Sequence, residues 1–343
     1  MFLARSVRDF QFLRAKTPSR FGSSIAMTIG NFDGFHLGHQ ALFSRLTELS
    51  PPGATRVLVS FVPHPKAYFN TSGRHERLRS EAYRLLTPPR RKAELAASLG
   101  FDAFLLLRFS RRLAEMSASD FMKHIVLEGV NPQTLVVGYD WVFGKDRKGD
   151  VELLRTVGRE EGIVVDVVPP FNMRCEAESP TRVSSSRVRH ALSEGNLETV
   201  ECLLGRPFDV VGHVVHGEKR GRQIGFPTAN LHLPEQFLPK DGVYATLCEY
   251  DGLRELSVTN VGVRPTFLGR QRLVEVHILK RSGLELYGKR LRVTFVSRVR
   301  DEMKFSGIEQ LKHAIQSDVA SAELLLKASL SDSPQGSRDR ERR

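Results

Sequence analysis

Short apolar segments alternate with helix-like stretches through the first half of the chain. Five segments have the character of buried strands: Ser24–Ile29, Val57–Phe61, Phe104–Leu107, Thr134–Val137 and Ile163–Val168. Between them apolar residues recur at helical spacing, as in Leu37–Leu49, Ala93–Leu99, Ser119–Glu128 and Val151–Glu160. Strands that alternate with helices predict an α/β domain, with a parallel sheet covered on both faces and ligands at the carboxyl ends of its strands.

The pattern changes after Pro169. The segment Ser185–Leu204 has helical spacing, with Gly195 as an interruption. Beyond it, alternating β-type runs separated by Gly and Pro predict an antiparallel barrel or sandwich. These runs are Val210–Val215, Val243–Glu249, Leu256–Val261, Val274–Leu279 and Leu291–Ser297. A helix over Ile308–Ala328 should close this domain, and the polar tail from Ser331 should be disordered.

Composition and charge narrow the class of protein. The chain has 343 residues, which suggests about two domains. Its 51 Lys and Arg against 39 Asp and Glu give a net charge of +12, which favours anionic partners without choosing among them. Much of the excess lies in Arg74–Lys92, which we expect to be a solvated basic surface. No apolar run approaches the length of about 18 residues that a membrane span needs, and Arg5 and Arg8 interrupt the amino-terminal apolar stretch, so we expect a cytoplasmic protein.

The first candidate for chemistry is the turn from the Ser24–Ile29 strand into the next helix. Gly30, Gly34 and Gly38 allow close approach of the backbone to a ligand, and a helix N-terminus offers unpaired N–H groups to an anion. His36 and His39, three residues apart, should point to the same place and suit the oxygens of a triphosphate. A helix-capping pair and half of a zinc site are the alternatives, and zinc lacks further ligands at fitting spacing.

Residues 30–39, GNFDGFHLGH, resemble the nucleotidyltransferase motif of the bacterial bifunctional riboflavin kinase/FAD synthetase family. Three further family motifs follow in order: SFVPHP at 60–65, VGYDWVFGKDRKGD at 137–150 and SSSRVR at 184–189. The resemblance implies a Rossmann-like domain in which His36 and His39 hold the phosphates of ATP and stabilise the transition state.

The same resemblance implies roles for the neighbouring residues. The glycines Gly30 and Gly34 would bind ATP, and Asn31 and Asp33 would lie beside the nucleotide and its magnesium ion. Asp140 would lie near ATP or the flavin, and Pro63, His64 and Pro65 would lie on the flavin side. Phosphates would meet Ser185, Ser186 and Arg189, in agreement with the ability of serines to cap a helix and of arginine to bind phosphate with two hydrogen bonds.

The second candidate is the glycine-rich stretch GHVVHGEKRGRQIGFPTANL at 212–231. The amides around Gly217, Gly221 and Gly225 could cradle phosphates, with help from Lys219, Arg220 and Arg222. The Thr228 hydroxyl and the Asn230 carboxamide are suitable oxygen ligands for Mg²⁺ that bridges the phosphates of ATP. A tight turn is the alternative for a glycine-rich loop taken alone.

The segment GFPTAN at 225–230 resembles the riboflavin kinase motif of the same family, which would add Phe226 and Pro227 to the ATP site. Matches follow in order at 241–245, 260–267, 274–279, 286–288 and 300–305. In a strand, Glu275 faces away from Val274 and Val276, and the resemblance implies that Glu275 accepts the proton of the ribityl hydroxyl. Arg300 would lie on the flavin side of this site.

These motifs together predict two domains, an FMN adenylyltransferase at 1–186 and an antiparallel β-barrel riboflavin kinase with a terminal helix at 187–330, followed by a tail at 331–343. The expected substrates are riboflavin, FMN and ATP, with Mg²⁺ as cofactor and neither nucleic acid nor a membrane as partner. Whether the protein forms a homo-oligomer is left open. The alternatives are an enzyme with one of the two activities and, from net charge alone, a basic nucleic-acid-binding protein.

Overall fold

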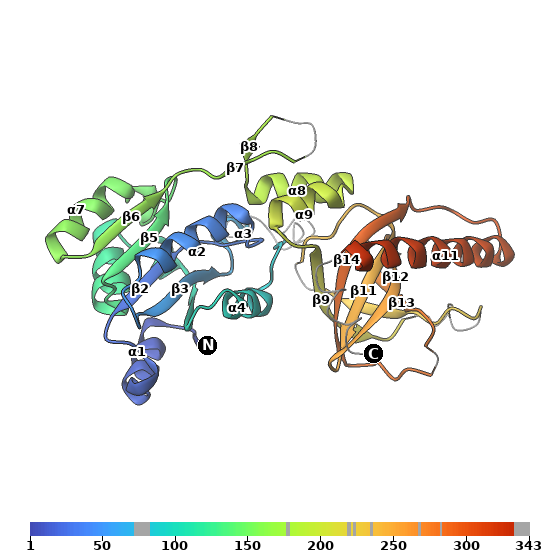
Figure 1. Cartoon of the computed structure of the whole chain (residues 1–343), viewed down its shortest axis with the longest axis horizontal. Coiled ribbons are helices and arrows are strands. Elements are labelled where there is room, and N and C mark those ends of the chain that lie inside the picture. Colours follow the sequence, from blue (N-terminus) through green and yellow to red (C-terminus); the bar gives the residue numbers. More distant parts are fainter. Residues whose placement is uncertain are drawn as a thin grey trace. The chain divides into compact units, whose positions relative to one another are not determined.

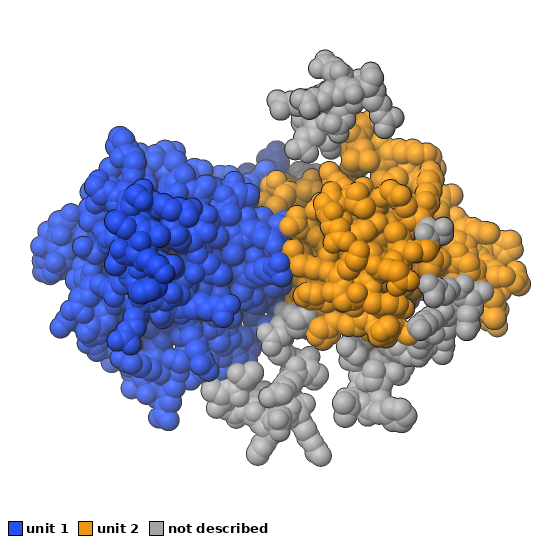
Figure 2. Space-filling model, turned by 90° about the horizontal axis from the view of Figure 1, so that it is seen from below, with its two compact units in different colours: residues 1–185 blue, residues 186–343 orange. Residues whose placement is uncertain are grey.

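The computed structural model describes residues 1–71, 83–175, 179–217, 221, 224–233, 236–266, 269–281 and 283–332. The chain divides into two compact units, Met1–Ser185 and Ser186–Arg343, which Figure 2 shows in blue and orange. Within the described residues, no helix combines the length and the apolar character that crossing a bilayer requires.

The first unit is built on a six-stranded sheet in the order β1-β4-β3-β2-β5-β6, in which every pair of neighbours is parallel (Figure 1). The strands are β1 (Phe2–Ala4), β2 (Ile25–Ile29), β3 (Thr55–Val62), β4 (Ala103–Arg108), β5 (Thr134–Gly138) and β6 (Val164–Val168). The predicted α/β architecture is confirmed. The three-residue edge strand β1 was not predicted, because it is too short to show a periodicity.

Helices cover both faces of this sheet, because the strand residues are apolar on both sides. Residues of α2 (Leu37–Leu49) and α4 (Pro89–Ser98) form one core with Ala26 and Leu58. The other core holds Met27 and Val59 together with residues of α1 (Val7–Lys16), α6 (Ala118–Phe121), a π-helix (Met122–Val130) and α7 (Val151–Glu161). The remaining elements are a 3₁₀ turn at Pro18–Arg20, α3 (Pro65–Thr71), α5 (Arg111–Ala114), a 3₁₀ turn at Lys145–Arg147 and the hairpin β7 (Asn172–Met173) and β8 (Thr181–Arg182).

The strand order locates the binding edge of the sheet. The chain passes from β2 through β3 to β4 on one side, and β5 then pairs with β2 on its other side. Ligands of open α/β sheets bind at such a reversal, at the carboxyl ends of the strands. The segments that follow β2 and β5 carry His36, His39 and Asp140, so this topology brings two of the predicted motifs to one edge.

The predicted helical segment at 185–204 is interrupted at Gly195, which has a φ of +77° and joins α8 (Ser185–Glu194) to α9 (Leu197–Leu204). The barrel of the second unit closes in the order β10-β13-β12-β11-β14-β9, with antiparallel pairs throughout. Its strands are β9 (Phe208–Val215), β10 (Ala229–His232), β11 (Gly242–Tyr250), β12 (Leu253–Thr266), β13 (Gly269–Ile278) and β14 (Arg290–Arg300). The structure thus selects the barrel over the sandwich.

Helix α11 (Ile308–Asp332) packs on the outside of this barrel (Figure 1). Ala322 and Leu326 are fully buried against a cluster that includes Val243, Ala245 and Leu247 of β11. The predicted start of this helix is confirmed, but the helix continues to Asp332, so the predicted disorder from Ser331 is wrong for its first two residues. The rest of the predicted tail, 333–343, lies outside the described residues.

Candidate functional site

The turn after β2 has an uncommon backbone that its aromatic side chains hold in place. Phe32, Gly34 and Phe35 have φ values of 43°, 96° and 50°. Positive φ is costly for phenylalanine, and it persists where the surroundings fix it. Both phenylalanine rings are buried, and their centroids lie 5.1 and 5.4 Å from that of Phe43 in α2. This packing places His36 at the N-cap position of α2.

His36 and His39 lie face to face at the start of α2. Their ring centroids are 3.6 Å apart and the ring planes differ by 16°. The Nδ1 atom of His36 accepts a hydrogen bond of 3.3 Å from the His39 backbone N–H. Because Nδ1 is the acceptor, the proton of a neutral His36 is on Nε2. The sequence alternatives of a cap and a phosphate site are therefore compatible: His36 caps the helix with one ring nitrogen and has a donor left on the other.

Both imidazoles are neutral near pH 7. Burial lowers the pKa of His36 to about 4, against an opposing effect of the nearby Asp33 carboxylate. Burial also lowers the pKa of His39 well below its usual value, with smaller contributions from His36 and Lys92. Nδ1 of His39 is buried, and no hydrogen-bond partner is found for it among the described residues. Neutral donors of this kind can bind phosphate oxygens without carrying a charge of their own.

Asp33 fastens the turn to the segment before α4. Its carboxylate oxygens accept hydrogen bonds from the backbone N–H groups of Leu86 and Thr87, at 3.2 and 3.0 Å, and the side chain is buried. The Gly34 N–H donates in turn to the Thr87 hydroxyl at 3.1 Å. The sequence could suggest Asp33 as a functional residue, but these partners, 53 and 54 residues further along the chain, could not be read from it.

Lys92 is 2% exposed, and its ammonium group donates to the carbonyl oxygen of Asn31, which also accepts from the Ser60 hydroxyl at 3.1 Å. The expectation of a solvated basic surface at 74–92 is therefore wrong for Lys92, because this side chain reaches inward to the turn after β2. Residues 74–82 of that segment lie outside the described residues. The Asn31 side chain is exposed at the same edge.

One further predicted group, Asp140, lies at the same edge together with an arginine that was not predicted. Asp140, which follows β5, forms a salt bridge of 2.5 Å with Arg182, whose guanidinium also lies 4.9 Å from the ring centroid of Tyr139. Both partners influence the pKa of His36, so they lie close to the histidine pair. Arg182 was not identified from the sequence, although it stands two residues before the SSSRVR motif. The only signal in the sequence that could have suggested Arg182 is its position next to this motif.

The SSSRVR motif begins α8. The hydroxyl of Ser185 donates a hydrogen bond of 2.7 Å to the carbonyl oxygen of Asp33, which ties the start of α8 to the turn after β2. Ser186 is exposed, and Arg189, one turn later, lies 5.9 Å from the ring centroid of Phe237.

The Pro63-His64-Pro65 segment leaves β3 at the same edge and leads into α3. The Val62–Pro63 peptide bond is cis. The Nδ1 atom of His64 accepts from the Lys66 N–H at 3.1 Å, and the His64 ring lies 4.4 Å from that of Tyr83. Nearby, Phe61, Tyr68 and Phe69 surround Phe109 at centroid distances of 5.3 to 6.0 Å. These aromatic faces could stack on a planar ring system.

In the second unit, Asn230, Glu275 and Asn260 form a row across three neighbouring strands. Glu275 of β13 is paired in register with Asn230 of β10 and with Asn260 of β12. All three are half-buried, whereas Val274 and Val276 are buried inside the barrel. Side chains opposite each other in an antiparallel sheet have Cβ atoms about 5 Å apart, so the predicted base and the predicted metal ligand Asn230 are direct neighbours.

The glycine-rich segment lies against this row. A Cβ atom on Gly217 would lie 2.2 Å from the Asn230 carboxamide nitrogen, and one on Gly221 would lie 2.3 Å from the carbonyl oxygen of Phe226. Gly225 has a φ of +90° and faces open space. Gly217 therefore allows the loop to approach the predicted metal ligand Asn230 closely, and Gly221 allows it to approach the backbone of Phe226. The predicted phosphate ligands Lys219 and Arg222, and their neighbour Arg220, lie outside the described residues.

Arg300, predicted on the flavin side, binds a carboxylate of α11. Its guanidinium donates to both carboxylate oxygens of the buried Asp318, each at 2.7 Å. The Arg300 guanidinium also lies 5.7 Å from the ring centroid of Phe305. This fork-to-fork pairing attaches the terminal helix to β14.

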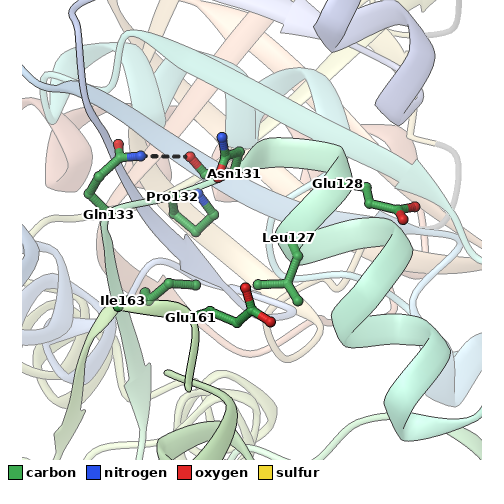
Figure 3. A pocket seen from close by; sticks show the side chains of 8 residues that line it. Leu127, Glu128, Asn131, Pro132, Gln133, Glu161 and Ile163 are labelled. Atoms are coloured by element: carbon green, nitrogen blue, oxygen red, sulfur yellow. Dashed lines mark hydrogen bonds between the residues drawn. The ribbon is translucent and has the colours of Figure 1, made fainter. Parts of the chain in front are cut away.

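One cavity lies away from these groups. It has a volume of about 390 Å³ and is lined by Leu127, Glu128, Asn131–Gln133 and Glu161–Ile163 (Figure 3). Asn131–Gln133 precede β5 and Gly162–Ile163 precede β6, so the cavity is at the amino ends of the strands, the opposite edge of the sheet from His36. The hydrogen bond drawn there joins the Gln133 carboxamide to the Asn131 carbonyl at 3.3 Å.

Comparisons with known proteins match both units. The family model described as FAD synthetase matches residues 19–187, and the one described as riboflavin kinase matches residues 204–326. A bifunctional riboflavin kinase/FMN adenylyltransferase of Pseudomonas fluorescens is 40% identical over 87% of this chain and 92% of its own length. The protein of the same description from Escherichia coli K12 is 39% identical over 86% and 91%.

Among solved structures, a crystal structure of a macrolide-efflux protein from Streptococcus pneumoniae is similar over 94% of this chain and 98% of that one. The TM-score is 0.77 and the sequence identity 28%. The description as an efflux protein is that of the streptococcal chain. The likeness extends over nearly the whole chain and so includes both the parallel sheet and the barrel.

Proposed function

The chain belongs to the family of bifunctional riboflavin kinases/FMN adenylyltransferases, and from that premise we propose how its residues divide the two reactions. The carboxyl-terminal domain phosphorylates riboflavin to FMN with ATP, and the amino-terminal domain adenylylates FMN to FAD. We propose that the adenylyltransferase domain comprises residues 1–186 and the kinase domain residues 187–330. The observation that best supports the proposal is the pair of neutral histidines at the reversal point of the sheet, with a separate row of Asn230, Glu275 and Asn260 on the barrel.

In the adenylyltransferase site, the work is charge stabilisation and positioning. A phosphate oxygen of FMN attacks the α-phosphorus of ATP, the bond from that phosphorus to the bridging oxygen breaks, and pyrophosphate leaves. His36, through Nε2–H, and His39 donate to phosphate oxygens as charge grows on them. Because α2 begins at this edge, its N-terminal N–H groups add to a positive environment. The SSSRVR residues Ser185, Ser186 and Arg189 are the proposed phosphate ligands from the following segment.

Two residues and one segment near this site have different proposed tasks. Asp33 acts through the backbone, since its carboxylate already accepts two N–H groups and holds Gly30–Gly34 in place. Arg182 becomes a phosphate ligand when a polyanion competes with Asp140 for its guanidinium. The segment Pro63–Pro65, with the aromatic side chains beside it, lies on the flavin side.

In the kinase site, the 5′-hydroxyl oxygen of riboflavin attacks the γ-phosphorus of ATP. The hydroxyl proton passes to the Glu275 carboxylate, the bond to the β-phosphate oxygen breaks, and ADP leaves. Thr228 and Asn230 present a hydroxyl and a carboxamide oxygen, and within the described residues no group of three or more His, Cys, Asp or Glu could hold a metal ion. Such a sparse oxygen donor set fits Mg²⁺ that arrives on ATP and, when bound, neutralises phosphate charge. Arg300 has a supporting task, in that it anchors α11 beside this site.

The direct test is incubation of the purified protein with riboflavin, ATP and Mg²⁺, followed by chromatography. FMN should form first and FAD later, and chelation of the metal should stop both. Unchanged riboflavin and unchanged added FMN would overturn the proposal. RNA binding without flavin turnover would favour the nucleic-acid alternative, for which net charge is the sole support.

We place the enzyme in the cytoplasm with no membrane partner, and light scattering tests whether it is a homo-oligomer.

A further inference from the structure

His277 lies on the same outer face of β13 as Glu275. The two residues are separated by Val276, and Val276 and Ile278 are buried in the barrel. Alternate residues of a strand share a face, so Glu275 and His277 are neighbours along the strand on the side of the glycine-rich segment. No motif assigned a task to His277, although the sequence analysis singled out its strand.

The ring of His277 contacts the GFPTAN segment in two ways. Its Nδ1 atom is 2.8 Å from the carbonyl oxygen of Pro227. A carbonyl can only accept, so Nδ1–H is the donor. The same ring meets the ring of Phe226 edge to face at a centroid distance of 5.6 Å.

The contact between His277 and Pro227 lies just beyond the end of the hydrogen-bonded ladder between β10 and β13. Strand β10 begins at Ala229, which pairs with Val276, and Asn230 pairs with Glu275. One step further back in this register, Thr228 would stand opposite His277, but Thr228 and Pro227 are outside the ladder. Proline has no N–H to donate, so Pro227 can be tied to β13 only by a hydrogen bond that its carbonyl oxygen accepts. His277 provides it.

We propose that His277 is a positioning residue of the kinase site: its Nδ1–H holds Pro227 and thereby keeps Thr228 at a fixed place relative to Glu275 on the same strand. The inference rests on the proposed roles of Thr228 as a metal ligand and Glu275 as the base. The hydroxyl of Thr228 is one residue from the held carbonyl and would otherwise precede β10 without a tether from β13. The expected benefit is in the binding of Mg·ATP, because the metal ligand is the group that the contact fixes.

The experiment compares three substitutions in the full-length protein. In His277→Asn, the carboxamide nitrogen can occupy the place of Nδ1 and donate to Pro227. In His277→Gln, the donor reaches the place of Nε2 instead, and His277→Phe keeps a ring against Phe226 without any donor. We expect His277→Asn to stay within about twofold of the unmodified protein, and His277→Phe and His277→Gln to raise the KM for Mg·ATP about tenfold, the size expected for one lost hydrogen bond. The kcat at saturating Mg·ATP should change less than the KM.

Conversion of added FMN to FAD by the same preparations reports the first unit and should be equal in all three, and a retained kcat at saturating Mg·ATP shows that the barrel is folded. His213→Phe, at an exposed histidine of β9, is the matched control and should leave riboflavin phosphorylation unchanged. Equal KM values in His277→Phe and the unmodified protein, or an equal loss in His277→Asn and His277→Gln, would overturn the proposal. If His277→Phe is unstable, the Asn and Gln pair decides. Absence of riboflavin phosphorylation in the unmodified protein would instead reject the proposed function.

Discussion

His36 and His39 are buried in their neutral forms, and this burial makes the first unit sensitive to acid. An unfolded histidine has a pKa of about 6.5, whereas that of folded His36 is about 4. Between these values the unfolded chain binds more protons than the folded one, so stability falls as the pH falls. For His36 alone the loss at pH 5 is about 2 kcal/mol.

We therefore expect the urea midpoint of the first unit to fall between pH 7 and pH 5, and to fall less in His36→Asn. Trp141 is the chain's one tryptophan and is stacked on Phe143 at 4.4 Å, so its fluorescence reports the unfolding of this unit. An identical pH dependence in both proteins would mean that His36 is not held neutral. The sequence could identify the histidine pair from its spacing, but the neutral state depends on burial under residues distant in the chain, and no spacing reveals that.

At the scale of elements, the position of Asn230 in β10 depends on the close approach of the glycine-rich segment. A methyl group at position 217 would lie 2.2 Å from the Asn230 amide nitrogen. Gly217→Ala should therefore displace Asn230 and lower riboflavin phosphorylation about tenfold or more, with FMN adenylylation unchanged; initial rates of both reactions measure this. Gly307→Ala is the control, because its new methyl group would meet no atom within 4 Å. Equal rates in both variants would show that Asn230 does not need its present position.

The sequence predicted most elements that carry a clear period, and it missed those that do not. Strand β10 was not predicted as a strand, because its alternation of apolar and polar residues extends over only four positions. The choice between barrel and sandwich depends on the pairing of β9 with both β10 and β14, and such pairings are tertiary. By contrast, alternation alone predicted correctly that Glu275 faces away from the barrel interior.

At the scale of the whole molecule, the two reactions are assigned to separate sets of site residues. His39→Ala should make FMN from riboflavin but almost no FAD, and Glu275→Gln should make FAD from added FMN but almost no FMN from riboflavin. A mixture of the two variants should restore FAD synthesis from riboflavin, because FMN released by one chain can be used by the other; chromatography of the products measures it. Failure of the mixture, with each single activity intact, would indicate that FMN is not released between the steps.

The family motifs allowed the order of the two activities to be predicted, since they lie in separate halves of the chain. The motifs could not predict which residues contact one another within each site. Arg182 beside Asp140 and Lys92 under Asn31 are joined across 42 and 61 residues of sequence, respectively, and neither partner stands out by its residue type.

The closed barrel constrains how this enzyme can vary. Glu275 is in register with a neighbour on each side, and every strand of the barrel has two partners. A single inserted residue in the middle of β13 would turn the carboxylate into the apolar interior and a valine outward. Substitutions outside the site that keep the alternation of the strands can therefore accumulate among descendants of the gene, whereas changes of strand length in β13 would remove folding and phosphorylation in one step.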